Sequence, residues 1–132
     1  MPLMPTPRHL LSAAVLALAA CSSVDGAARA AGPGRPFDLK PGASATLAGG
    51  GTLRYLALVD DSRCRPDVQC IWAGDAEIAL EWSAGGTAPA RFNLHVQPAS
   101  SRHALDAGRQ LHLIALGRGA APVATLQVDA AP

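Results

Sequence analysis

Two runs of alternating apolar residues, 52–60 and 76–82, flank a connection that holds two of the chain's three cysteines. Alternation with a period of two is typical of a β-strand, so the connection joins two predicted strands. In the second run the apolar residues Ala76, Ile78, Leu80 and Trp82 alternate with other residues and are predicted to face the core. The first run is apolar on both faces, which predicts a central strand, and one of those faces carries Leu53, Tyr55, Ala57 and Val59.

Five further short runs are separated by turns that contain Gly or Pro, and residues 97–107 have the composition of a loop. The runs cover residues 37–39, 44–47, 91–96, 110–116 and 123–128. In one of them, 110–116, the alternation places three residues on a common face: Leu111, Leu113 and Ala115. The predicted fold class is therefore all-β, a small antiparallel β-sandwich or barrel-like domain of about seven strands.

The amino-terminal segment, residues 1–20, has the pattern of a secretory signal peptide. Arg8 and His9 precede an apolar run that is too short to span a bilayer as a helix and that ends in small residues. The four residues 18–21, Leu-Ala-Ala-Cys, resemble the bacterial lipobox, in which the chain is cut before the cysteine and the cysteine is acylated. The alternative is an ordinary signal peptide that happens to be followed by a cysteine.

The lipobox resemblance implies a lipoprotein in which palmitate or a similar acyl chain on Cys21 is the membrane anchor. Ser22, rather than Asp, follows the cysteine. By resemblance to the sorting rule of Gram-negative lipoproteins, this favours the periplasm-facing side of the outer membrane. The expected organisation is a lipoprotein signal peptide at 1–20, a flexible Ala/Gly/Pro tether at 21–36 and a single β domain at 37–132.

With Cys21 assigned to lipid, Cys64 and Cys70 remain as an even pair in an oxidising compartment. A structural disulfide is the favoured interpretation. A metal-thiolate pair would need further ligands, and no histidine lies within twenty residues of Cys70 on its carboxyl side. A redox-active pair, the remaining alternative, more usually has CxxC spacing at the start of a helix.

Three other residues of the connection have predicted structural roles. Arg63 lies among several carboxylates and is expected to form a bidentate ion pair that holds the disulfide ring against the sheet. Trp72 would lie on the same side as Cys70 in an extended backbone and is expected to cover the sulfurs from water. Gly74 is expected to have a positive φ or to allow a close backbone approach.

The segment DSRCRPDVQCIWAGDAEIALEW, residues 61–82, resembles a group of small secreted and lipid-anchored bacterial proteins. The group shares an approximate Asp-Ser-Arg-Cys-Pro pattern, then Cys-x-Trp-x-Gly-x-Ala and an alternating strand. QLHLIALGRGAAP, residues 110–122, is similar to the closing strand and turn of that group. Here Arg65 stands where the group has proline directly after the first cysteine. The resemblance implies a domain type and no activity.

Loops on a rigid β-scaffold commonly carry recognition, so the motif is also a possible interaction surface. The residues proposed for it are Asp61, Ser62, Arg63, Arg65, Trp72, Gly74 and Asp75.

Two kinds of metal site are weakly indicated, and neither is predicted. Ca²⁺ favours several carboxylate oxygens on a loop, and the connection and its edges carry four acidic residues: Asp60, Asp61, Asp67 and Asp75. No Asp-x-Asp-x-Asp ladder is present, and arginines lie among these carboxylates. His95 and His112 lie on predicted strands and His103 on the loop between them, so two of the three could converge if those strands pair.

Enzymatic activity and a cofactor are not predicted. A nucleophilic triad needs Ser or Cys with His and an acid, and one cluster offers these groups: Ser100, Ser101, His103 and Asp106. The sequence has neither a GxSxG nor an HExxH motif. The eleven Lys and Arg residues, less Arg8 in the signal, balance the ten Asp and Glu residues, which argues against nucleic acid as a partner.

The predicted function is that of a lipid-anchored periplasmic interaction or accessory module without enzymatic activity, whose partners are the membrane, through the lipid, and an envelope protein. The alternative is a small periplasmic protein that binds a metal or another ligand.

Cys64→Ser is expected to lower the free energy of unfolding by about 2 kcal/mol, because the short ring no longer restricts the unfolded chain. Urea denaturation of the oxidised parent and the variant measures the difference. Equal stability of the two proteins would mean that the bridge is absent or unimportant.

Overall fold

The computed structural model describes residues 32–106 and 108–130, and the predicted signal peptide and Cys21 lie outside these ranges. Within them, eight β-strands and one short 3₁₀ turn follow one another along the chain. The elements are β1 (Phe37–Leu39), β2 (Ser44–Thr46), β3 (Thr52–Asp61), β4 (Ala76–Ser83), β5 (Ala90–His95), η1 (Pro98–Ser100), β6 (Arg102–Asp106), β7 (Arg109–Leu116) and β8 (Ala124–Ala130). In this part of the chain, no helix has the length and apolar character that crossing a membrane requires.

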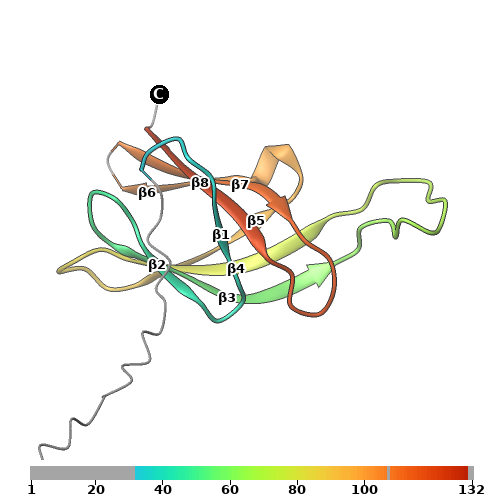
Figure 1. The fold of residues 1–132 in the computed structure, drawn as a ribbon, viewed down its shortest axis with the longest axis horizontal. Helices are drawn as coiled ribbons and strands as arrows, with labels where there is room; N and C mark the ends of the chain where they lie inside the picture. The colour runs from blue at the N-terminus through green and yellow to red at the C-terminus, as the bar shows by residue number, and fades with distance from the viewer. Residues whose placement is uncertain (1–31, 107, 131–132) are drawn as a thin grey trace, which may run out of the picture.

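The strands form two four-stranded antiparallel sheets, in the orders β1-β8-β7-β6 and β2-β3-β4-β5. The two sheets pack as a sandwich (Figure 1), so the predicted all-β class is confirmed. β3 lies inside its sheet, between β2 and β4, as its two apolar faces indicated.

The core lies between the two sheets and consists mainly of leucine. β4 alternates between buried and half-buried positions along its whole length, with the predicted set facing inward. Only 4% of the chain is aromatic, so aliphatic side chains provide most of the buried apolar area. The largest side chains below 2% exposure are Tyr55, Leu39, Leu53, Ile78, Leu80, Leu94, Leu111, Leu126 and Pro122.

The predicted common face of the first run is wrong beyond Tyr55. Leu53 and Tyr55 are buried, but Ala57 is exposed and Val59 is 51% exposed. The pairing of β3 with β4 shifts between Tyr55 and Ala57 and again between Leu58 and Asp60. Each bulge adds one residue to β3, and one added residue exchanges the faces of those that follow.

β7 departs from strict alternation for the same reason. Its pairing with β8 shifts between Leu113 and Ala115, so Ala115 is exposed and Leu116 is buried. The predicted face of Leu111, Leu113 and Ala115 is therefore wrong at its last position.

The predicted loop at 97–107 also needs correction, because it contains the short turn η1 and the edge strand β6. β6 has no fully buried residue, which explains why its apolar pattern is weak. His103 consequently lies on a strand and not on a loop.

Arg109 joins the two sheets at one end of the sandwich. Its Nη1 donates hydrogen bonds to the carbonyl oxygens of Ala48 (3.0 Å) and Gly50 (2.9 Å), which belong to the turn between β2 and β3. Asp106 accepts hydrogen bonds from the other side of the guanidinium, which also lies 5.2 Å from the centre of the Trp82 ring. Asp106, in the same sheet, thus neutralises the charge of the guanidinium, and the remaining guanidinium donors bond to the other sheet.

Tyr55→Phe is expected to leave the free energy of unfolding unchanged or to raise it by up to about 1 kcal/mol. The Tyr55 hydroxyl is buried and makes no hydrogen bond with the residues described, so its removal eliminates an unsatisfied polar group. Urea denaturation followed by circular dichroism tests this. A loss of more than about 1 kcal/mol would show that the hydroxyl has a bonding partner, such as a bound water.

Candidate functional site

The connection between β3 and β4, residues 62–75, extends well beyond the ends of the sheets (Figure 1); we call it the projecting loop. Two backbone hydrogen bonds continue the β3–β4 ladder into its base. The Ser62 amide donates to the Asp75 carbonyl (2.7 Å), and the Cys64 amide donates to the Ala73 carbonyl (2.9 Å). The base of the projecting loop is therefore a short continuation of the hairpin.

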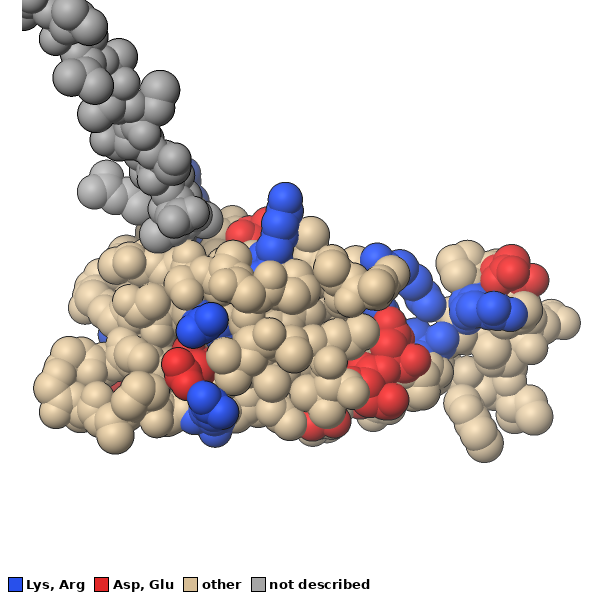
Figure 2. Space-filling model, turned by 90° about the horizontal axis from the view of Figure 1, so that it is seen from below, with Lys and Arg blue, Asp and Glu red and all other residues tan. Residues whose placement is uncertain are grey.

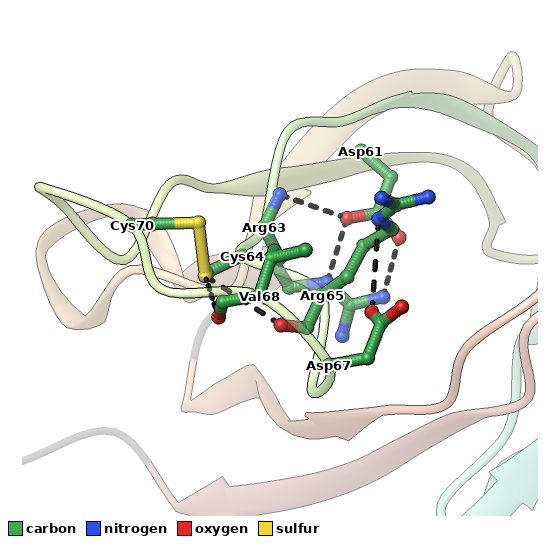
Figure 3. Close-up of a disulfide and its surroundings, with 7 residues drawn as sticks. All are labelled: Asp61, Arg63, Cys64, Arg65, Asp67, Val68 and Cys70. Atoms are coloured by element: carbon green, nitrogen blue, oxygen red, sulfur yellow. Dashed lines mark hydrogen bonds and ion pairs between the residues drawn. A yellow bond between two sulfur atoms is a disulfide. The ribbon is translucent and has the colours of Figure 1, made fainter.

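A disulfide closes the outer part of the projecting loop. Cys64 and Cys70 are bonded, with their Cα atoms 5.8 Å apart, which confirms the predicted bridge. Figure 3 shows the bridge beside the side chains of Asp61 and Arg63 at the base. The bridge supplies a covalent restraint in a segment that lies outside the hydrophobic core.

Arg63 fixes the base of the projecting loop to the opposite sheet. Its Nε and Nη2 donate to the Asp61 carboxylate at 2.8 and 2.6 Å, the bidentate pair that the sequence predicted. Its Nη1 and Nη2 also donate to the carbonyl oxygens of Leu116 and Gly117, each at 2.7 Å. Hydrogen bonding by Arg63, together with the charges of Arg63 and Arg118, holds the pKa of Asp61 below its usual value.

Ser62 and Gly74 meet across the base of the projecting loop. The Ser62 hydroxyl donates to the Asp75 carbonyl and accepts from the Asp75 amide, both at 3.1 Å. Gly74 has a φ of +71°, and a β-carbon there would lie 1.9 Å from the Ser62 carbonyl oxygen. Both expectations for Gly74, a positive φ and a close backbone approach, are confirmed.

His95, on the neighbouring strand β5, bonds to Asp75 at the end of the projecting loop. Its Nδ1 lies 2.6 Å from Asp75 Oδ2, and the Gln97 amide donates to Asp75 Oδ1 at 3.2 Å. Burial raises the pKa of Asp75, but bonding to His95 and to backbone amides outweighs it and leaves this pKa lowered. Sequence reasoning missed this contact, although the β4–β5 hairpin register, which pairs Glu77 with His95, would have placed His95 near Asp75.

The outer part of the projecting loop carries exposed apolar side chains. Ile71 is 97% exposed, Trp72 77% and Val68 42%. The expectation that Trp72 covers the disulfide is wrong, because the chain bends at Ile71 and Trp72 instead of remaining extended, and Cys70 is itself exposed. Large apolar groups on a soluble domain's surface, gathered in one place, mark a candidate contact surface.

A shallow groove separates the projecting loop from the turn between β7 and β8. In Figure 2 the loop stands off from the body, and basic and acidic side chains gather near their junction. The groove is lined by Asp61, Arg63, Arg65, Pro66, Asp67, Arg118 and Gly119. Arg65 and Asp67 are both largely exposed, and their closest charged atoms are 3.8 Å apart, so this ion pair is weak.

Two of the four carboxylates that suggested calcium, Asp61 and Asp75, are bonded to different side chains. Asp61 pairs with Arg63, and Asp75 pairs with His95. The strand pairing that would have brought the histidines together does not occur, because β5 and β7 lie in different sheets. The His103 ring stacks on Phe92 at a centroid distance of 3.8 Å. Among residues 32–106 and 108–130, no group of three or more His, Cys, Asp or Glu side chains is arranged to hold a metal ion.

The groups that suggested a nucleophilic triad also have other partners. Ser101 is buried, and its hydroxyl donates to the Pro98 carbonyl at 3.0 Å. His103 is stacked on Phe92, and Asp106 is bonded to Arg109. Ser101, His103 and Asp106 therefore form no relay from hydroxyl to imidazole to carboxylate.

Comparison of the chain with protein-family models, with curated proteins and with solved structures finds no match.

Gly74→Ala is expected to destabilise the protein by about 3 kcal/mol or more, because the new methyl group collides with backbone at Ser62. Gly86→Ala is the matched control: its φ is also positive, at +81°, but no atom lies within 4 Å of the new β-carbon. The control should lose only the conformational term of about 1 kcal/mol. Urea denaturation compares the two, and equal losses would contradict the close approach.

Proposed function

We propose that this protein is a lipid-anchored lipoprotein of the periplasmic face of the outer membrane, without enzymatic activity, that binds an envelope protein through its projecting loop. The lipobox-like segment ending at Cys21 supports the anchor. The bridge between Cys64 and Cys70 supports an oxidising compartment, because structural disulfides persist there. The resemblance of residues 61–82 to small secreted and lipid-anchored bacterial proteins agrees with both.

The observation that carries the proposal is the exposure of Ile71 and Trp72 on a restrained loop. Tryptophan is enriched among the residues that dominate binding energy at protein interfaces. The disulfide, the Arg63–Asp61 pair and the backbone ladder order the base before any partner binds. Ordering in advance reduces the entropy lost on binding, so a small apolar tip on such a base is an efficient anchor.

A larger partner protein fits these side chains better than a second copy of the same loop. A tryptophan buries about 150–250 Å², whereas a stable interface buries about 800 Å² on each partner. Two loops that met tip to tip would fall short of that area. A partner with a pocket for Trp72 would cover the tip and also contact the groove beside it.

The direction of the projecting loop also favours a protein partner over the anchoring membrane. The Gly34 amide donates to the Val128 carbonyl, so the tether joins the sandwich near the end of β8. Arg63 contacts Leu116 and Gly117, which pair with the residues at the start of β8. Leu116 pairs with Ala124, four residues before Val128, so the two attachment points are about 13 Å apart along β8 at 3.3 Å per residue. The loop therefore points away from the end that leads to the lipid.

Site-specific photocrosslinking tests the proposed function. A photoreactive amino acid replaces Trp72 in the full-length chain in its native cells, and Thr87, in the exposed turn between β4 and β5, is the control position. We expect a discrete protein adduct from position 72 and none from position 87, because only the first lies on the proposed surface.

The same experiment distinguishes the alternatives. Adducts of equal yield from both positions would indicate random collision and contradict the proposal. Adducts with phospholipid in place of protein would assign the loop to the membrane and would also contradict it.

A further inference from the structure

The groove beside the projecting loop contains two guanidinium groups that have bonding capacity to spare. These two groups are Arg65 and Arg118. The third arginine of the groove, Arg63, already uses four of its five N–H donors on Asp61, Leu116 and Gly117. Arg118 lines the groove and makes no hydrogen bond or ion pair with the residues that the structure describes. Arg65 has only its weak contact with Asp67, at 3.8 Å.

The acidic residues of the groove do not cancel this positive charge. The Asp61 carboxylate is occupied by both donors of Arg63 and by the Arg63 amide, at 3.2 Å. Asp67 is the remaining carboxylate of the lining, which also contains Arg65, 3.8 Å away, and Arg118. The lining therefore has one net positive charge, located on groups that lie on both sides of the groove.

We propose that the groove binds a carboxylate of the partner protein, an acidic side chain or the carboxyl terminus, beside the apolar group that covers Trp72. This inference rests on the proposed function and specifies its partner. Guanidinium groups bind carboxylates with paired, charge-assisted hydrogen bonds, which give orientation as well as affinity. The partner segment thus combines one acidic group with a neighbouring apolar pocket or side chain.

Charge complementarity favours a single carboxylate over an anionic membrane surface. Membrane surfaces attract clusters of basic residues, whereas the projecting loop and its base also carry exposed carboxylates at Asp60 and Asp67. A flat layer of lipid phosphates would lie close to these carboxylates as well as to the arginines, so repulsion would oppose the attraction. A protein segment that enters the groove places its one carboxylate between Arg65 and Arg118.

The test measures the yield of the protein adduct from position 72 in charge variants. Arg118→Glu and Arg65→Gln are expected to lower the yield of this adduct by about tenfold, because each removes a charge-assisted hydrogen bond. Arg118→Gln removes the charge without adding repulsion and should lower it in the same direction. Arg102→Glu, on the edge strand β6, reverses an exposed charge elsewhere and should leave the yield unchanged.

Each outcome has a distinct meaning. Loss in the groove variants alone, with an acidic residue or a chain end within a few residues of the crosslinked site, supports the proposal. An adduct insensitive to Arg118 and Arg65 overturns the carboxylate site and leaves the proposed function standing. If the parent gives no protein adduct from position 72, the proposed function fails and this inference fails with it.

Discussion

Hydrogen bonding by two arginines ties the two sheets together at opposite ends of the sandwich. Arg63, beyond the end of β3, reaches carbonyl oxygens at the end of β7, and Arg109, at the start of β7, reaches carbonyl oxygens before β3. Each guanidinium is neutralised by an aspartate two or three residues earlier in the chain. The planar, multiply donating guanidinium can bond a carboxylate and several carbonyls at once, which a lysine ammonium does with less directional precision.

The projecting loop depends on this arrangement because it has no hydrophobic core of its own. Cys64 and Cys70 restrain its outer part, Ser62 and Gly74 hold its two strands close together, and Arg63 fixes its base to the other sheet. Polar contacts hold the base of the loop. The apolar side chains at its tip are exposed and belong to no core. Exposed Ile71 and Trp72 are open to non-specific association, a cost that the proposed binding role would account for.

The sequence predicted those features that depend on neighbouring residues. The alternation of β4, the bridge between two nearby cysteines, a bidentate pair of Arg63 with a carboxylate, and the close approach at Gly74 all follow from short-range patterns. The sequence left open which of four aspartates pairs with Arg63, and the structure shows Asp61. Features that depend on strand register were not predicted. The bulges in β3 and β7 reversed the faces of Val59 and Ala115, and the weak pattern of β6 concealed a strand. His95 belongs to the site through the register of the β4–β5 hairpin, and Arg118 through the placement of the turn between β7 and β8; the strand patterns alone specify neither.

The two tryptophans differ sharply in environment. Trp82 is 5% exposed beneath Arg109 in the sandwich, and Trp72 is 77% exposed on the projecting loop. An indole in water fluoresces at longer wavelength than one in an apolar interior and is open to collisional quenchers. The molecule therefore carries two intrinsic optical probes, one that reports the integrity of the core and one that reports the surroundings of the projecting loop, and iodide or acrylamide separates their signals without any added label.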